Sequence, residues 1–446
     1  MVNGYLTADE IIEKTVHLMN SKTGLISATN EVLLESGNPE IIVYSSMLSK
    51  LENSRSHIKL RINDGLAMAG SGSSTSRKYA KAKAICEALE RYCNISYNPA
   101  DVKVATRNEL GESAVDLSRF PKGTKEEYAL PTQSYSQADN DKRIRWVKGH
   151  SLTSGESLWV PFSCVYISTP FEFPGETFFI PISTGSAIAG NFERAVVSGA
   201  LEVIERDALS LTWLQEFPLK RIDYSSCKNP EFWQRLQSIE KSGIKQSFFD
   251  ATMEHGFPTV YAVQEAPNSD LNLLVMAATR YNIEDAMIRV MDEAISSRTA
   301  IEHLVRQPKL YDPTDFSSFT RLTDGAVYYG DKSNSHAFDF LMKKPVDIAL
   351  EDTTSITVEN EVDMLNEIIA RFKKNDMDLI VVDISVPQLK EVGLRAVRVV
   401  VPELMPLTTD HSMKFSATQR IYDVAKKLGY DSKAFGELNN NPQPFA

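Results

Sequence analysis

Four glutamates in two short and similar stretches are the residues of this sequence best suited to chemistry. The two stretches share the pattern E-x-x-E-R, first at Glu87, Glu90 and Arg91 and again at Glu202, Glu205 and Arg206. Glutamates three residues apart on an α-helix project from the same face, so the two carboxylates of a pair can act together. Magnesium prefers oxygen ligands and commonly meets nucleotide phosphates in such sites. The pattern therefore predicts a magnesium–nucleotide site.

The bland interpretation of the same pattern is a solvated helix face. Glu and Arg are good helix formers, and a single E-x-x-E-R string is usually exposed. Here both copies lie among apolar residues, as AICEALERY at 84–92 and GALEVIERD at 199–207. Buried carboxylates are costly unless they are paired or bind a metal. The two copies together favour a functional site over a fortuitous repeat.

Two helices must position these glutamates. The second is predicted over 195–213, where apolar residues cover nearly the whole circumference, which is typical of a buried helix. The first follows the small, hydroxyl-rich segment 69–76, AGSGSSTS, which we expect to be a loop. Its backbone N–H groups could bind a phosphate at the helix N-terminus, although helix capping alone also explains the serines. The sequence has no Walker A loop.

The rest of the pattern predicts a mixed α/β protein of the α+β class. Thr7 and Glu10 can form a capping box at the start of a helix over 7–20. A third long helix is predicted over 283–306, with Glu293 and Arg298 interpreted as a solvated ion pair beside its apolar face. The other expected elements are a hairpin over 146–167, a helix over 358–375, and strands within 38–50, 57–62, 248–252, 259–266, 271–280, 378–384 and 394–404.

We expect one domain over residues 1–446. Its predicted parts are an N-terminal helical segment at 1–21, a variable surface section at 98–143 and a Pro-containing tail at 437–446. The composition of this tail, taken alone, indicates disorder.

The bulk composition excludes several classes of function. The net charge of −11 disfavours binding to nucleic acid and to an anionic membrane, since both reward basic surfaces. No apolar run is long enough to span a bilayer, and the N-terminus does not resemble a signal peptide. The 4 cysteines form no zinc or disulfide pattern, so reduced thiols and a cytoplasmic location are expected.

Several motifs in fixed order resemble the YcaO family, and more narrowly its azoline-forming cyclodehydratases of ribosomal peptide biosynthesis. They are AICEALERY, NFERAVVSGALEVIERDALSLTW, MDEAISSR, GLRAVRVVVPELMPL and a terminal PQPF. The similarity runs from about Lys22 to the last residue. The resemblance implies a YcaO-type fold in which Glu-rich helices, and not a P-loop, bind ATP and Mg2+.

The resemblance also implies roles for individual residues. The implied magnesium ligands are Glu87, Glu90, Glu202 and Glu205. The implied nucleotide-binding residues are Lys22, Asn191, Glu193, Arg206 and Arg298, of which Arg298 is also implied as catalytic. The spacing from Asn191 to Glu202 is one residue shorter than in the family, which leaves open whether Glu193 or Arg194 fills the next acidic position. Ser296 stands where the family often has Gln.

Azoline-forming members end in P-x-P-x-P, and this tail enters or borders the active site. Pro442 and Pro444 match that motif, whereas Ala446 replaces the last proline; the resemblance places all three among the catalytic residues. Proline pre-orders an extended tail at little entropy cost, so the loss of one weakens docking without abolishing it.

The implied reaction forms an azoline ring from a Cys, Ser or Thr residue of a precursor peptide. The side chain attacks the preceding backbone carbonyl, the amide oxygen takes the γ-phosphoryl group of ATP, and phosphate leaves. A separate leader-peptide-binding partner is expected, a dehydrogenase could act afterwards, and a homodimer is the family tendency. Two alternatives remain: a thioamide- or amidine-forming YcaO enzyme, and a non-catalytic nucleotide-binding subunit of a peptide-modifying complex.

Overall fold

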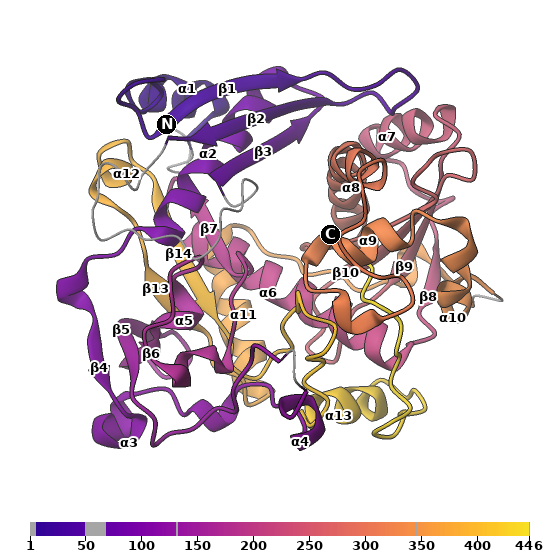
Figure 1. Cartoon of the computed structure of the whole chain (residues 1–446). Helices are drawn as coiled ribbons and strands as arrows, with labels where there is room; N and C mark the ends of the chain where they lie inside the picture. Colours follow the sequence, from indigo (N-terminus) through magenta and orange to yellow (C-terminus); the bar gives the residue numbers. More distant parts are fainter. Residues whose placement is uncertain (1–5, 50–67, 131–132, 344–345, 446) are drawn as a thin grey trace.

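Three sheets and a central helix make up the chain in this computed structural model, which describes residues 6–49, 68–130, 133–343 and 346–445 (Figure 1). The predicted strand at 57–62 lies outside the described residues. Within them all strand pairs are antiparallel except β12 with β8, so the predicted α+β class is confirmed. None of the described helices is long and apolar enough to cross a bilayer.

The N-terminal sheet carries the first glutamate helix. Its strands are β1 (Ile26–Val32), β2 (Ile42–Leu48) and β3 (Ala69–Ser74), and they pack on α2 (Arg77–Ile95) beside α1 (Ala8–Thr15). The predicted capping box of Thr7 and Glu10 is confirmed at the start of α1.

The loop predicted at 69–76 is wrong over most of its length, because Ala69–Ser74 form strand β3. Glycines allow the strand to lie directly on the helix: a Cβ added to Gly72 would stand 2.2 Å from the Ala80 carbonyl oxygen. The N–H of Ser71 donates to Glu87 Oε2 at 2.9 Å, so this backbone group already has a protein acceptor.

The second sheet has the strand order β4-β5-β13-β14-β7, with β6 paired to β5. The predicted hairpin is confirmed as β5 (Ile144–Ser151) and β6 (Ser157–Pro161). The other strands are β4 (Lys103–Ala105), β7 (Ser186–Ala189), β13 (Ile380–Asp383) and β14 (Arg395–Val400). Short helices α3 (Arg107–Leu110), α4 (Lys125–Tyr128), α5 (Phe162–Val165) and α12 (Pro387–Glu391) complete this part.

The section at 98–143 is not confined to the surface. It supplies strand β4, and Leu117 and Phe120 within it are buried in the core beneath the second sheet.

The third sheet has the order β11-β10-β9-β8-β12. Its strands are β8 (Lys220–Asp223), β9 (Lys245–Asp250), β10 (Thr259–Glu265), β11 (Leu273–Thr279) and β12 (Asp347–Ala349). The helices associated with it are α7 (Pro230–Lys241), α8 (Ile283–Val305), α9 (Leu322–Tyr328) and α10 (Asp339–Met342). Helix α8 matches the predicted third long helix within one residue.

Helix α6 (Phe192–Gln215) lies at the centre of Figure 1, between the second and third sheets. It contacts β14 and β7 on one side, β11 on another, and also α11 (Glu361–Lys374) and α13 (Arg420–Lys427). Apolar residues all round the helix are therefore explained by neighbours on several sides, as the sequence predicts.

A buried histidine gives the fold an acid-sensitive point. His255 is 3% exposed, and burial lowers its pKa to about 3 from an ordinary value of 6.5. As the pH falls below 6.5, the unfolded chain takes up a proton that the folded chain refuses, so stability decreases. Replacing His255 with Gln should remove about 1–2 kcal/mol of the stability lost between about pH 7 and pH 5.

Urea unfolding at the two pH values measures this difference. The matched control is His336→Gln, at an exposed position, which should keep the wild-type dependence on pH. An unchanged pH dependence in the His255→Gln variant would contradict the assignment.

Candidate functional site

The glutamates of helices α2 and α6 lie close enough to affect one another's pKa values. Burial raises the pKa of Glu90 well above 4.5, and the carboxylates of Glu202 and Glu87 raise it further. Burial likewise raises the pKa of Glu205 to about 8, with Glu293 and Glu202 contributing in the same direction. These carboxylates from separate helices are close enough to repel one another, as expected for a site that a cation completes.

Arginines and backbone N–H groups hold these carboxylates. Arg91 pairs with Glu87 at 2.9 Å, and Arg206 Nη2 lies 3.4 Å from Glu202 Oε1 and 3.6 Å from Glu205 Oε1. The N–H of Gly185 donates to Glu202 at 3.0 Å, and that of Thr279 donates to Glu205 at 3.2 Å.

The side chains are partly accessible, which a ligand site requires. Glu87 and Glu202 are 34% and 27% exposed, whereas Glu205 is 7% exposed. The site is thus partly exposed at Glu87 and Glu202 and buried at Glu205.

The donor set fits a hard cation, although its side chains are not yet arranged around one. Four carboxylates supply the oxygen ligands that magnesium prefers. Across the described part of the chain, no three Asp, Glu, His or Cys side chains are grouped closely enough to hold a metal. The arginine pairs must therefore open for the carboxylates to converge. The assignment of Glu87, Glu90, Glu202 and Glu205 as magnesium ligands stays a prediction.

Helix α8 adds charged groups to this neighbourhood. Arg289 pairs with Glu293 at 2.5 Å, and its pKa is raised, against the effect of burial, by Glu293, Glu205, Asp292 and Glu87. Sequence reasoning missed Arg289 because a pair four residues apart on a helix usually lies in solvent.

Lys83 adds a cation from helix α2. Burial and the nearby Arg289 lower its pKa to about 8, and its Nζ donates to the Ser73 carbonyl at 2.8 Å. The site therefore contains cations, Lys83 and Arg289 among them, as well as carboxylates.

Arg298 occupies a different place. It is 1% exposed, its Nε donates to Gln264 Oε1 at 3.1 Å, and its Nη1 donates to the Leu271 carbonyl at 2.9 Å. It lies nine residues beyond Arg289 on α8, about 13 Å along the helix axis. The predicted solvated pair with Glu293 is wrong, since Arg298 pairs with Glu302. Its catalytic and nucleotide-binding roles stay predictions to which these contacts add no support.

The remaining implied nucleotide residues lie at element boundaries. Asn191 caps α6, where its Oδ1 accepts from the Arg194 N–H at 2.8 Å. Glu193 lies in the first turn of α6, nine residues and about 13 Å along the axis from Glu202. Lys22 is exposed in a turn, and its backbone N–H donates to Asn20 Oδ1. No described contact joins these three residues to the glutamates, and their roles stay predictions.

The C-terminal tail is ordered up to Phe445, so the prediction of disorder is wrong. Trp213 Nε1 donates to the Asn441 carbonyl at 3.1 Å, and the Tyr329 hydroxyl donates to that of Pro442 at 2.7 Å. Pro442 and Pro444 are buried, and Ala446 lies outside the described residues. The ring of Phe445 lies 4.1 Å from the guanidinium carbon of Arg206. The tail therefore reaches the edge of the glutamate site.

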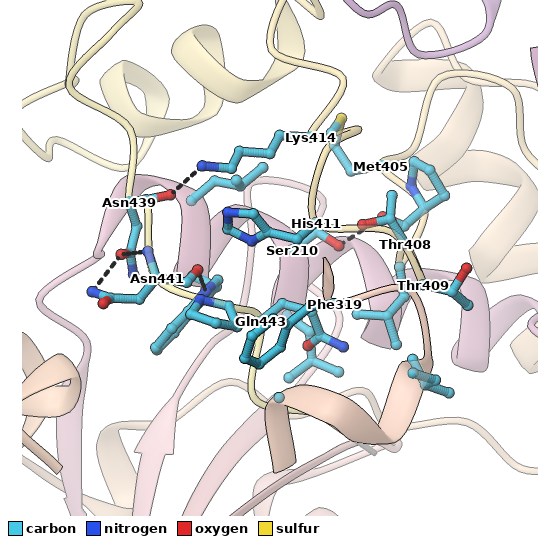
Figure 2. Close-up of a pocket in the computed structure, with 18 of the residues that line it drawn as sticks. Ser210, Phe319, Met405, Thr408, Thr409, His411, Lys414, Asn439, Asn441 and Gln443 are labelled. Carbon is cyan, nitrogen blue, oxygen red and sulfur yellow. Dashed lines mark hydrogen bonds between the residues drawn. The ribbon is translucent and has the colours of Figure 1, made fainter. Parts of the chain in front are cut away.

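A pocket adjoins the tail (Figure 2). It holds about 650 Å3 of empty space, partly open to solvent, and Leu209, Ser210 and Trp213 of α6 line it one to two turns beyond Arg206. Figure 2 shows His411 and Lys414 beside Asn439 and Asn441 of the tail. Burial lowers the pKa of His411 to about 4 and that of Lys414 to about 8.

A second cavity of about 540 Å3 includes Cys164 and Arg398 among its lining residues. Burial lowers the pKa of Arg398 to about 10, an effect that Glu202 and Glu90 oppose. This cavity is thereby linked electrostatically to the glutamate site.

Solved structures share this fold. A heterocyclase in complex with substrate and cofactor matches with a TM-score of 0.78, 22% identity and coverage of 99% of this chain and 57% of its own. The heterocyclase TruD gives a TM-score of 0.63 at 22% identity, over 82% of this chain and 50% of its own. The YcaO protein of Methanopyrus kandleri bound with AMPPCP and Mg2+ gives 0.61 at 18% identity, over 89% and 91%. This chain spans only about half of the two heterocyclases.

Curated relatives carry no assigned activity. An uncharacterized protein of Methanothermobacter thermautotrophicus is 27% identical over 362 residues, which cover 80% of this chain and 86% of that protein. An uncharacterized protein in the tfuA 3′ region of Rhizobium leguminosarum bv. trifolii is 29% identical over 199 residues, or 43% and 44%.

These findings define the class: an ATP- and Mg2+-binding protein with the heterocyclase fold. The profile of the YcaO cyclodehydratase family, described as ATP- and Mg2+-binding, matches residues 71–405. The chain belongs to the YcaO family, and the resemblance stated from its motifs is confirmed.

Proposed function

We propose that the protein is an ATP-dependent cyclodehydratase that converts Cys, Ser or Thr residues of a precursor peptide into azolines. The single observation that carries this proposal is the contact between Phe445 of the Pro-containing tail and Arg206 of the glutamate site. The contact supports the proposal because the PQPF motif then lies against Arg206, one of the residues proposed to bind nucleotide.

The chain's own residues have two tasks in this reaction. Glu87, Glu90, Glu202 and Glu205 would hold the divalent cation once the arginine pairs of Glu87, Glu202 and Glu205 open, and Arg206 would face the phosphates. Bound Mg2+ neutralises phosphate charge, the usual requirement of phosphoryl transfer. The Cys, Ser or Thr side chain bonds to the preceding carbonyl carbon, and the former amide oxygen takes the phosphoryl group from ATP and leaves as phosphate. The side-chain and amide protons are also lost, so the peptide loses one water overall. Positioning and charge neutralisation supply most of such catalysis.

The peptide is expected to arrive with help. We propose a separately encoded protein that binds its leader segment, a homodimer of this chain, and a dehydrogenase acting on the product in some pathways. The microcin synthetase complex of Escherichia coli, which this fold matches with a TM-score of 0.58, is itself a multi-protein assembly. ATP hydrolysis measured with peptide, in the presence and absence of the candidate partner, decides whether the chain needs it.

Mass spectrometry of the peptide product tests the reaction. Incubation with ATP and Mg2+ should remove one water for each modified residue. An exchange of oxygen for sulfur would instead establish the thioamide-forming alternative. Intact peptide together with measurable nucleotide binding would favour the non-catalytic subunit.

A further inference from the structure

The guanidinium carbon of Arg206 lies over the ring of Phe445, 4.1 Å from the ring centre. Phe445 is 3% exposed, and the Arg206 side chain is 16% exposed. A cation over an aromatic face is most strongly attracted when both are withdrawn from water. One guanidinium is thus shared between the tail and the glutamate site.

The edges of the same guanidinium have unused hydrogen-bonding capacity. Nη2 faces Glu202 and Glu205, whereas Nε and Nη1 are buried and have no acceptor among the described residues. A buried donor without an acceptor destabilises the protein until an acceptor arrives. Both atoms are covered, so a ligand oxygen reaches them only after a neighbouring side chain shifts. The stacked ring limits how far the guanidinium itself can turn.

The ring of Phe445 is held from several sides. The tail backbone accepts hydrogen bonds from Trp213 and Tyr329, and Phe445 forms a bridge with Val275 of β11. Helix α9 approaches so closely that a Cβ at Gly325 would stand 1.8 Å from the Gln443 carbonyl oxygen. The position of Phe445, and with it that of Arg206, therefore depends on correct docking of the tail.

We propose that Phe445 is a positioning residue for Arg206, and that this pair couples tail docking to nucleotide binding. This coupling rests on the proposed nucleotide site, and it makes the affinity of that site depend on tail docking. An undocked tail leaves Arg206 free to turn, and the affinity for Mg2+–nucleotide falls. Because coupling between two binding events is reciprocal, bound nucleotide stabilises the docked tail by the same factor.

Isothermal titration calorimetry with AMPPCP and Mg2+ measures the coupling without needing a peptide substrate. Phe445→Leu keeps the apolar bulk but removes the aromatic face, and should weaken binding about tenfold. Phe445→Trp restores an aromatic face and should bind within about twofold of wild type, a rescue that simple packing does not explain. Equal affinities in the wild type and Phe445→Leu, or tighter binding in the variant, would overturn the proposal.

A second variant displaces the tail without changing Phe445 or Arg206. Gly325→Ala should drive Gln443 away and weaken AMPPCP binding by a similar factor. In wild type, Mg2+–AMPPCP should slow release of the last residues by a carboxypeptidase about tenfold, whereas Phe445→Leu should show little protection. Absence of protection in wild type would overturn the coupling. Failure of the wild type to bind AMPPCP at all would overturn the proposed nucleotide site as well, so the two failures are distinguishable.

Discussion

Glutamine in place of Glu202 or Glu205 is expected to weaken Mg2+–nucleotide binding about 100-fold or more, and Glu205→Gln should also make the ligand-free protein more stable. Loss of an orienting group around a metal already costs 10- to 100-fold, so loss of a proposed ligand should cost at least as much. Stability should rise because burial and neighbouring carboxylates disfavour the charge on Glu205. We expect the thermal midpoint of Glu205→Gln to increase by roughly 2–4 °C.

Calorimetry with AMPPCP and thermal unfolding, each with and without Mg2+, measure the two effects on the same samples. The matched control is Glu240→Gln, at an exposed position on α7, which should change neither quantity. Wild type should gain about 2.7 kcal/mol of stability at ligand concentrations 100 times its dissociation constant, and a chelator should remove most of that gain. Variants that bind like wild type, or a Glu205→Gln variant that is less stable without ligand, would contradict the assignment.

Removal of Arg420 should cause the largest loss of stability. Its guanidinium contacts Asp207 at 2.6 Å and Glu254 at 2.6 Å, and these pairs tie α13 and the segment after β9 to the central helix. Arg420→Met leaves two carboxylates that are 0% and 6% exposed without their cation. Breaking a buried pair from one side typically costs about 3–5 kcal/mol.

Urea unfolding gives the size of this loss, and two further variants test its cause. Arg221→Met breaks a pair with Asp347 whose members are 46% and 53% exposed, and should cost less than about 1 kcal/mol. Combining Arg420→Met with Asp207→Asn and Glu254→Gln should recover much of the stability, because no buried charge is then left unpaired. Equal losses from Arg420→Met and Arg221→Met would show that burial does not set the energy of the Arg420 pairs.

Some features were predictable from the sequence because each depends on residues that lie close together in the chain. The second glutamate helix follows from apolar residues that cover nearly its whole circumference, and the capping box of α1 follows from Thr7 and Glu10 alone. The family follows from motifs in fixed order, which neither periodicity nor composition supplies.

Features that depend on distant partners were not predictable in this way. Strand β3 was missed because Gly70 and Gly72 resemble loop residues until helix α2 lies against them. The tail was interpreted as disordered because its composition does not reveal the donors that its carbonyls meet, Trp213 of α6 and Tyr329 at the end of α9. The predicted partner of Glu293 was wrong for the same reason: Glu293 pairs with Arg289, and Arg298 with Glu302, because burial and pairing depend on how α8 packs.

We propose that carboxylates of α2 and α6 together hold a divalent ion and its triphosphate. A crystal structure with AMPPCP and Mn2+ in place of Mg2+ tests it most directly, because anomalous scattering locates the metal independently of the protein. We predict metal peaks within coordination distance of side chains from both helices, among them Glu90, Glu202 and Glu205, with the triphosphate beside Arg206. Metal and nucleotide bound elsewhere, with Glu202 and Glu205 still paired to Arg206, would contradict it.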